Sequence, residues 1–91
     1  MASMSELLHL AEIGQEVSEY AFQNGNTDLA TEIDKYNDKI YDLTQGSQNL
    51  GDILENIKLL QGVATKARVV DPVLTAKIEN LTERMLGEAY S

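Results

Sequence analysis

The fold is decided by residues 29–43, whose sequence is LATEIDKYNDKIYDL. The large apolar side chains of this stretch recur at steps of 4, 3, 4 and 3: Leu29, Ile33, Tyr36, Ile40 and Leu43. Such spacing places them along one face of an α-helix, as in the seam of a coiled coil or a tight bundle. The sequence therefore predicts an amphipathic helix that begins near Thr27, with Asn26 available to cap its first turn.

The same apolar frame continues past residue 43, through Ser47, Leu50, Leu54 and Ile57. A single helix over about 28–66 would keep this frame, but it would contain two glycines that each cost about 1 kcal/mol relative to alanine. A break in the polar segment 46–51 would instead separate a further helix, running roughly from Asp52 to Lys66. We favour the break, and a long helical hairpin is the alternative.

Two turn signals divide the rest of the chain. Asn24-Gly25 ends a first helix predicted over residues 5–23, because both residue types tolerate positive φ. Asp71-Pro72 begins a last helix predicted over residues 72–86, since Asp is a strong N-cap and Pro suits the first helical position. Gly87 is placed to act as the C-cap of this helix.

These elements predict an all-α, small antiparallel bundle of three to four helices in one domain, residues 1–91. The apolar arc of residues 52–66 is wider than that of the second predicted helix, and these residues are expected to form the central core helix. A chain of this length buries only about 60% of its unfolded surface, so oligomerisation or a bound partner is expected. One interpretation of residues 1–3, Met-Ala-Ser ahead of Met4, is a cloning remnant.

The chain is acidic, with 15 Asp and Glu residues against 7 Lys and Arg and a formal charge of -8. This charge argues against nucleic acid and anionic membranes as partners and favours basic protein surfaces. The acidic residues are concentrated in residues 1–34, which contain no Lys or Arg. The absence of cysteine excludes disulfides and thiolate chemistry, and it fits a cytoplasmic protein as well as a secreted bacterial one.

Motifs of catalysis are not visible in the sequence. The single histidine, His9, lies one helical turn from Glu12, with Glu16 beyond, but a carboxylate-bridged metal centre in a bundle would need Glu-x-x-His from two helices. Nothing resembles a nucleophile elbow or a phosphate-binding glycine loop. We therefore expect a protein that is not an enzyme and that uses no metal and no cofactor.

Asp34, Asp38 and Asp42 are spaced i, i+4 and i+8, which stacks three like charges along one ridge of the predicted helix. Lys35 and Lys39 occupy the adjacent ridge. One interpretation of the aspartates is a docking ridge for a basic partner helix, and the other is a solvated face that maintains solubility.

Four further residues are candidates for partner binding. Tyr36 lies on the apolar seam and Tyr41 lies off it, so each is either an interface anchor or an amphipathic residue at the edge of the core. Leu59 and Leu86 lie outside the narrow apolar stripes of their helices. They either cover neighbouring helices or contribute to an exposed apolar patch, which would mark a partner site.

These features indicate a protein–protein interaction module: a small acidic adaptor or chaperone that binds a partner helix in an apolar groove. Two alternatives remain at this point. One is a self-assembling structural subunit of a phage or secretion apparatus. The other is an acidic inhibitor that imitates nucleic acid.

Overall fold

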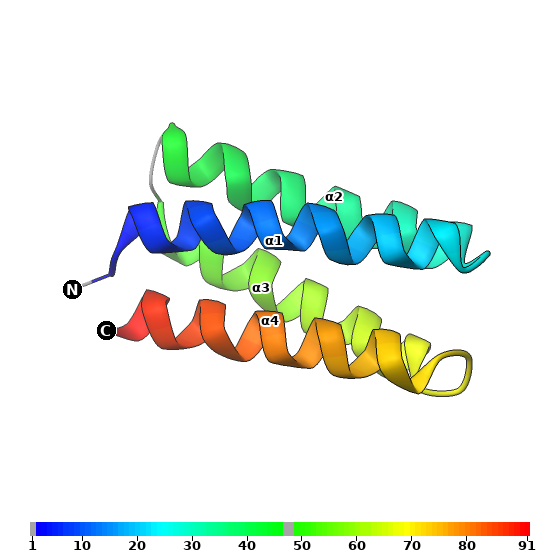
Figure 1. The fold of residues 1–91 in the computed structure, drawn as a ribbon. Coiled ribbons are helices and arrows are strands. Elements are labelled where there is room, and N and C mark those ends of the chain that lie inside the picture. Colours follow the sequence, from blue (N-terminus) through cyan, green and yellow to red (C-terminus); the bar gives the residue numbers. More distant parts are fainter. Residues whose placement is uncertain (1, 47–48) are drawn as a thin grey trace.

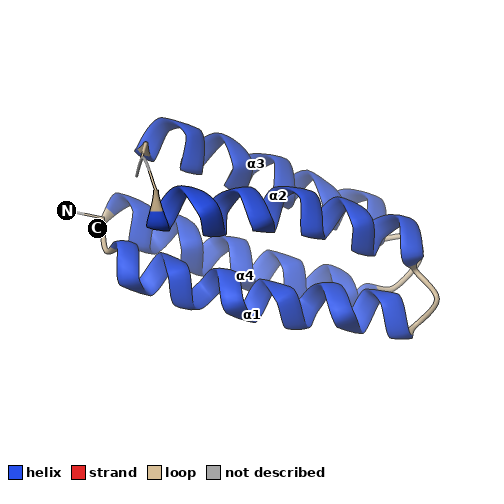
Figure 2. Ribbon diagram, turned by 90° about the horizontal axis from the view of Figure 1, so that it is seen from above, coloured by secondary structure: helices blue, strands red, loops and turns tan. Residues whose placement is uncertain are grey.

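The structure, a computed structural model, describes residues 2–46 and 49–91. These residues form four α-helices: α1 (Met4–Gln23), α2 (Thr27–Gln45), α3 (Leu50–Ala67) and α4 (Pro72–Tyr90). The helices pack as an antiparallel bundle of 36 × 19 × 17 Å, with both termini at one end (Figures 1 and 2). The predicted all-α bundle is confirmed. The alternative long hairpin is wrong, because α2 and α3 are separate helices; Ser47 and Gln48 lie outside the described residues.

The helix boundaries follow from local chemistry. Gly25 has a φ of 81°, which glycine adopts at little cost, and it reverses the chain between α1 and α2. Asp71 caps α4: its Oδ1 accepts hydrogen bonds from the backbone N–H groups of Val73 and Leu74. Asn49 caps α3 in the same manner by accepting from the N–H of Asp52 at 3.1 Å. Polar caps of this kind satisfy N–H groups that have no partner within the helix.

The predicted C-cap at Gly87 is wrong. The last helix passes through this glycine and ends at Tyr90. Ala89 is buried and packs with the core, so the final turn gains apolar contacts. These contacts offset the cost of a glycine inside a helix, which is about 1 kcal/mol.

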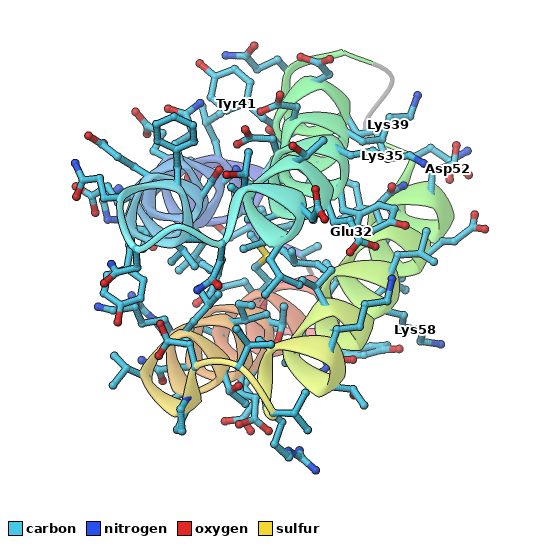
Figure 3. The ribbon with its side chains drawn as sticks, turned by 90° about the vertical axis from the view of Figure 1, so that its right-hand side faces the viewer. Glu32, Lys35, Lys39, Tyr41, Asp52 and Lys58 are labelled. Atoms are coloured by element: carbon cyan, nitrogen blue, oxygen red, sulfur yellow. The ribbon has the colours of Figure 1, made fainter. Side chains whose placement is uncertain are left out.

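The bundle has no central helix among its described residues. α1 contacts α2 and α4, and α3 contacts the same two helices, so each helix occupies one corner of a square (Figure 3). The prediction of a central helix over residues 52–66 is therefore wrong; the wide apolar arc of α3 covers two neighbours at a corner. Within it Ile57 is fully buried, whereas Leu54 is only partly buried.

The buried centre of α2 contains Asn37 and not Tyr36, which corrects the predicted seam. Asn37 is 0% exposed, and its Nδ2 donates to the backbone oxygen of Ala11 in α1 at 2.7 Å. Tyr36 lies at the edge of the core. A seam of alternating 3 and 4 steps describes contact with one partner, but α2 packs against two, so its buried arc is wider and includes the residue beside the seam.

Candidate functional site

The predicted acidic ridge is exposed along α2. Asp34, Asp38 and Asp42 are all exposed, and no Lys or Arg of the described residues forms an ion pair with them. Desolvation, together with the neighbouring carboxylates of Asp34 and Asp42, raises the pKa of Asp38. The three carboxylates therefore repel one another, and Lys35 and Lys39, one turn away on the neighbouring ridge, form no ion pair with them among the described residues.

This ridge begins beside α1. Asp34 lines a hollow between α1 and α2, and Tyr41, seven residues later, falls on the same side of the helix. Figure 3 shows Tyr41 projecting on the opposite side of α2 from Lys35 and Lys39. Tyr41 is partly buried against the core. The two lysines on the neighbouring ridge thus point away from the α1 side.

Tyr36 and Leu59 belong to the α2–α3 side of the bundle. Tyr36 follows Glu32 by one turn, and the carboxylate of Glu32 accepts a hydrogen bond from Lys66 of α3 at 2.6 Å. That bond and the charge of Glu32 raise the pKa of Lys66, and Tyr36 adds to this effect. Leu59 lies seven residues before Lys66 and is 44% exposed. On this side one ion pair, between Glu32 and Lys66, links α2 and α3.

Leu86 lies on a third side. It follows Glu79 by seven residues, and Glu79 forms an ion pair with Arg68 at the end of α3 at 3.7 Å. Leu86 therefore faces α3 and is partly buried against the core. The seven predicted partner-binding residues do not form one surface. Asp34 and Tyr41 lie on the α1 side of α2, Asp38 and Asp42 continue from Asp34 along the exposed ridge, Tyr36 and Leu59 lie on the α2–α3 side, and Leu86 lies on the α3–α4 side.

The hollow between α1 and α2 has a volume of about 500 Å³. Small, polar and acidic side chains and one aromatic side chain line it: Gln15, Ser18, Glu19, Phe22, Thr27, Ala30, Thr31 and Asp34. Phe22 is 63% exposed there. Phe22 and Glu19 were not identified from the sequence as candidate binding residues. The sequence does show that both lie off the apolar stripe of the first helix, which is the feature that could have identified them.

Three other hollows on the described surface have mixed charge. The one between α1 and α4 has a volume of about 210 Å³ and is lined by Glu16 together with Lys77 and Arg84. A second, near the turns, contains the ion pair of Glu32 and Lys66. The third, between α3 and α4, includes cationic and anionic groups as well. The α1–α2 hollow differs because its charged lining is acidic only.

We define the acidic face as the α1–α2 hollow together with the remainder of the ridge: Gln15, Glu19, Phe22, Thr31, Asp34, Asp38, Tyr41 and Asp42. Its hollow is floored by small residues, because Ser18 and Ala30 are buried where α1 and α2 approach each other. The Ser18 hydroxyl donates to the carbonyl of Ala30 at 3.2 Å, which ties the two helices together beneath it.

Side chains for metal or acid–base chemistry are not gathered anywhere in residues 2–46 and 49–91. No three His, Cys, Asp or Glu side chains lie close enough there to hold a metal ion, and His9 is exposed on α1. None of the four helices is long and apolar enough to cross a membrane.

Comparison with known proteins gives no match: no protein-family model, no curated protein and no solved structure is significantly similar to the chain.

Proposed function

We propose that this chain is a non-enzymatic interaction module, an adaptor or chaperone, that binds a basic partner helix along the acidic face. The observation that carries the proposal is the arrangement of charge. The ion pairs formed among the described residues lie on the α2–α3 and α3–α4 sides, whereas the carboxylates of the acidic face have no cationic partner. A cationic partner would supply the missing countercharge.

The charge of the whole chain supports this choice. Residues 1–46 contain nine acidic and two basic residues, whereas residues 47–91 contain six acidic and five basic residues. The α1–α2 half of the bundle therefore has nearly all of the net negative charge. An asymmetric electrostatic potential of this kind orients an approaching basic partner and increases its association rate.

The shape of the acidic face favours a helix as the partner. α1 and α2 lie antiparallel and side by side (Figure 2), and the hollow between them is a groove lined by residues 15–22 of α1 and 27–34 of α2, about two turns of each helix. A partner helix lying in such a groove contacts both walls through residues spaced by three and four. A cytoplasmic location and a protein partner form part of this proposal.

A basic peptide tests the proposal. The probe is a labelled Leu/Lys peptide of about 18 residues, long enough to form an amphipathic helix. Its binding is followed by fluorescence anisotropy with the wild-type chain and with the triple variant Asp34→Asn, Asp38→Asn, Asp42→Asn. We expect the triple variant to bind at least about tenfold more weakly.

The matched control changes net charge by the same amount on the other half of the bundle: Glu55→Gln, Glu83→Gln and Glu88→Gln. The control should retain most of the wild-type affinity at moderate salt, where distant charges are screened. Equal losses in the two triple variants would show that only total charge matters, and the proposed surface would then be wrong.

Self-association is a second proposal, supported by apolar side chains at the α3–α4 turn. Val69 is 90% exposed, and Val70 and Val73 are also exposed. Adjacent exposed apolar residues favour contact with another copy. Light scattering at two concentrations tests this: the mass should rise with concentration in the wild type and remain that of one chain in a Val69→Ser, Val70→Ser variant.

A further inference from the structure

The α1–α2 hollow offers hydrogen-bond acceptors, and two of its hydroxyl donors already form hydrogen bonds within the chain. Ser18 Oγ donates to the carbonyl of Ala30, and Thr31 Oγ1 donates to the carbonyl of Thr27 at 3.0 Å. Hydroxyl hydrogens engaged in this way are not available to a ligand. The hollow therefore suits a group that brings its own donors.

Its two carboxylates come from different helices. Glu19 projects from α1 and Asp34 from α2, and both line the hollow. Gln23 Nε2 donates to Glu19 Oε1 at 3.2 Å, which orients this carboxylate. Neither Glu19 nor Asp34 forms an ion pair within the described residues. A cation between them would be attracted from both walls.

The exposed ring of Phe22 distinguishes between the two cationic side chains, arginine and lysine, that a protein partner could supply. Phe22 lies one turn from Ser18 and three residues from Glu19, and it lines the same hollow. The flat guanidinium of arginine stacks on an aromatic face and presents five donors that match carboxylates in pairs. The ammonium of lysine is a strongly hydrated point charge with no planar face.

We propose that the hollow receives an arginine side chain of the basic partner helix, with its guanidinium over Phe22 and its donors directed to Glu19 and Asp34. This inference rests on the proposed function, because it identifies the residue by which that partner is held. The stem of the arginine would contact the methyl groups of the threonines and Ala30 along the floor.

The test compares two peptides of the same amphipathic pattern, Leu/Lys and Leu/Arg, each of about 18 residues. The wild-type chain should bind the arginine peptide about tenfold more tightly. Phe22→Ser should reduce this preference to about twofold or less, since the stacking surface is lost. Val69→Ser, which removes another exposed apolar side chain outside the hollow, should leave the preference unchanged.

A second variant tests the hollow itself. Thr31 is exposed, so Thr31→Leu fills the hollow with a side chain that has no aromatic face and leaves the core undisturbed, and it should also abolish the preference for arginine. An equal preference in the wild type, Phe22→Ser and Thr31→Leu would overturn the arginine site. The proposed function would survive that result if both peptides still bound more weakly to the Asp34/Asp38/Asp42 variant; no binding of either peptide would overturn both proposals.

Discussion

The side-chain amide of Asn37 in α2 occupies the space that a Cβ on Gly14 of α1 would need. A Cβ built on Gly14 would lie 2.0 Å from Asn37 Oδ1, closer than non-bonded atoms approach. Asn37 Nδ2 donates to Ala11 O, and its Oδ1 is buried without a hydrogen-bond partner among the described residues. This contact sets the separation and register of the two helices that form the acidic face.

Gly14→Ala should therefore destabilise the bundle by about 2 kcal/mol, because overpacking forces either the amide or the helices to move. Urea denaturation followed by circular dichroism measures the change. Gly62→Ala is the matched control, since a Cβ there meets nothing within 4 Å and alanine is the better helix former. The control should gain up to about 1 kcal/mol. A Gly14→Ala variant as stable as Gly62→Ala would contradict the close contact.

Three α3 substitutions should rank by burial. Ile57 is fully buried, Leu54 is partly buried and Leu59 is 44% exposed. Ile57→Asp should unfold the chain, because it places an unpaired charge in the core. Leu54→Asp should lower the melting temperature while leaving a folded protein, and Leu59→Asp should change it little. Thermal denaturation gives the order, and unfolding by Leu59→Asp but not by Ile57→Asp would show that the assigned faces of α3 are wrong.

The sequence predicted those parts of the fold that depend on local chemistry. Asn24-Gly25 and Asp71-Pro72 mark turns because glycine conformation and side-chain capping act over a few residues. The role of Asn37 depends on Ala11 and Gly14 of another helix, so no local pattern in α2 signals it. A polar residue beside an apolar seam reads as exposed until its partner helix is known.

The candidate site was predictable only in part for the same reason. The ridge of Asp34, Asp38 and Asp42 follows from helical spacing alone. Phe22 and Glu19 join it only because α1 packs beside α2 with its turn at Gly25, which is a property of the assembled bundle. The spacing of Tyr36 and Tyr41 alone puts them on different sides of α2, but the helix that each tyrosine faces is set by the assembled bundle.

The contact between α1 and the cap of α4 gives a third stability test. Tyr20 donates its hydroxyl hydrogen to Asp71 Oδ2 at 3.2 Å, while Oδ1 caps α4. Tyr20→Phe should cost up to about 1 kcal/mol through loss of this bond. Asp71→Ala removes both interactions and should cost more than Tyr20→Phe, at least about 1 kcal/mol. Tyr90→Phe at an exposed position is the control, and an equal loss there would argue against the Tyr20 bond.

The raised pKa of Asp38 makes stability depend on pH. Because the folded-state pKa lies above the ordinary value of 3.8, the folded state binds a proton more tightly than the unfolded state does. At neutral pH, the ionised carboxylate of Asp38 therefore lowers the free energy of unfolding. This loss of stability is relieved as the pH falls through the folded-state pKa toward 3.8, because Asp38 becomes protonated. Asp38→Asn should stabilise the chain at pH 7 by about 0.5 kcal/mol or less.

Chemical denaturation of the wild type and Asp38→Asn at pH 7 and near pH 4 measures this difference. The stabilisation by asparagine should shrink at the lower pH. Glu55→Gln, a neutralisation away from the ridge, should not show this pattern. A benefit of Asp38→Asn that grows on acidification would contradict the sign derived from the ridge.

Chemical-shift mapping of the ¹⁵N-labelled chain during titration with the Leu/Arg peptide tests the central claim most directly. The largest amide shifts should fall on the acidic face, on the neighbours of Glu19, Phe22, Asp34 and Asp38, and should be lost in the triple aspartate variant. Shifts confined to the outer surfaces of α3 and α4, with α1 and α2 unperturbed, would contradict the proposal that the acidic face binds the partner.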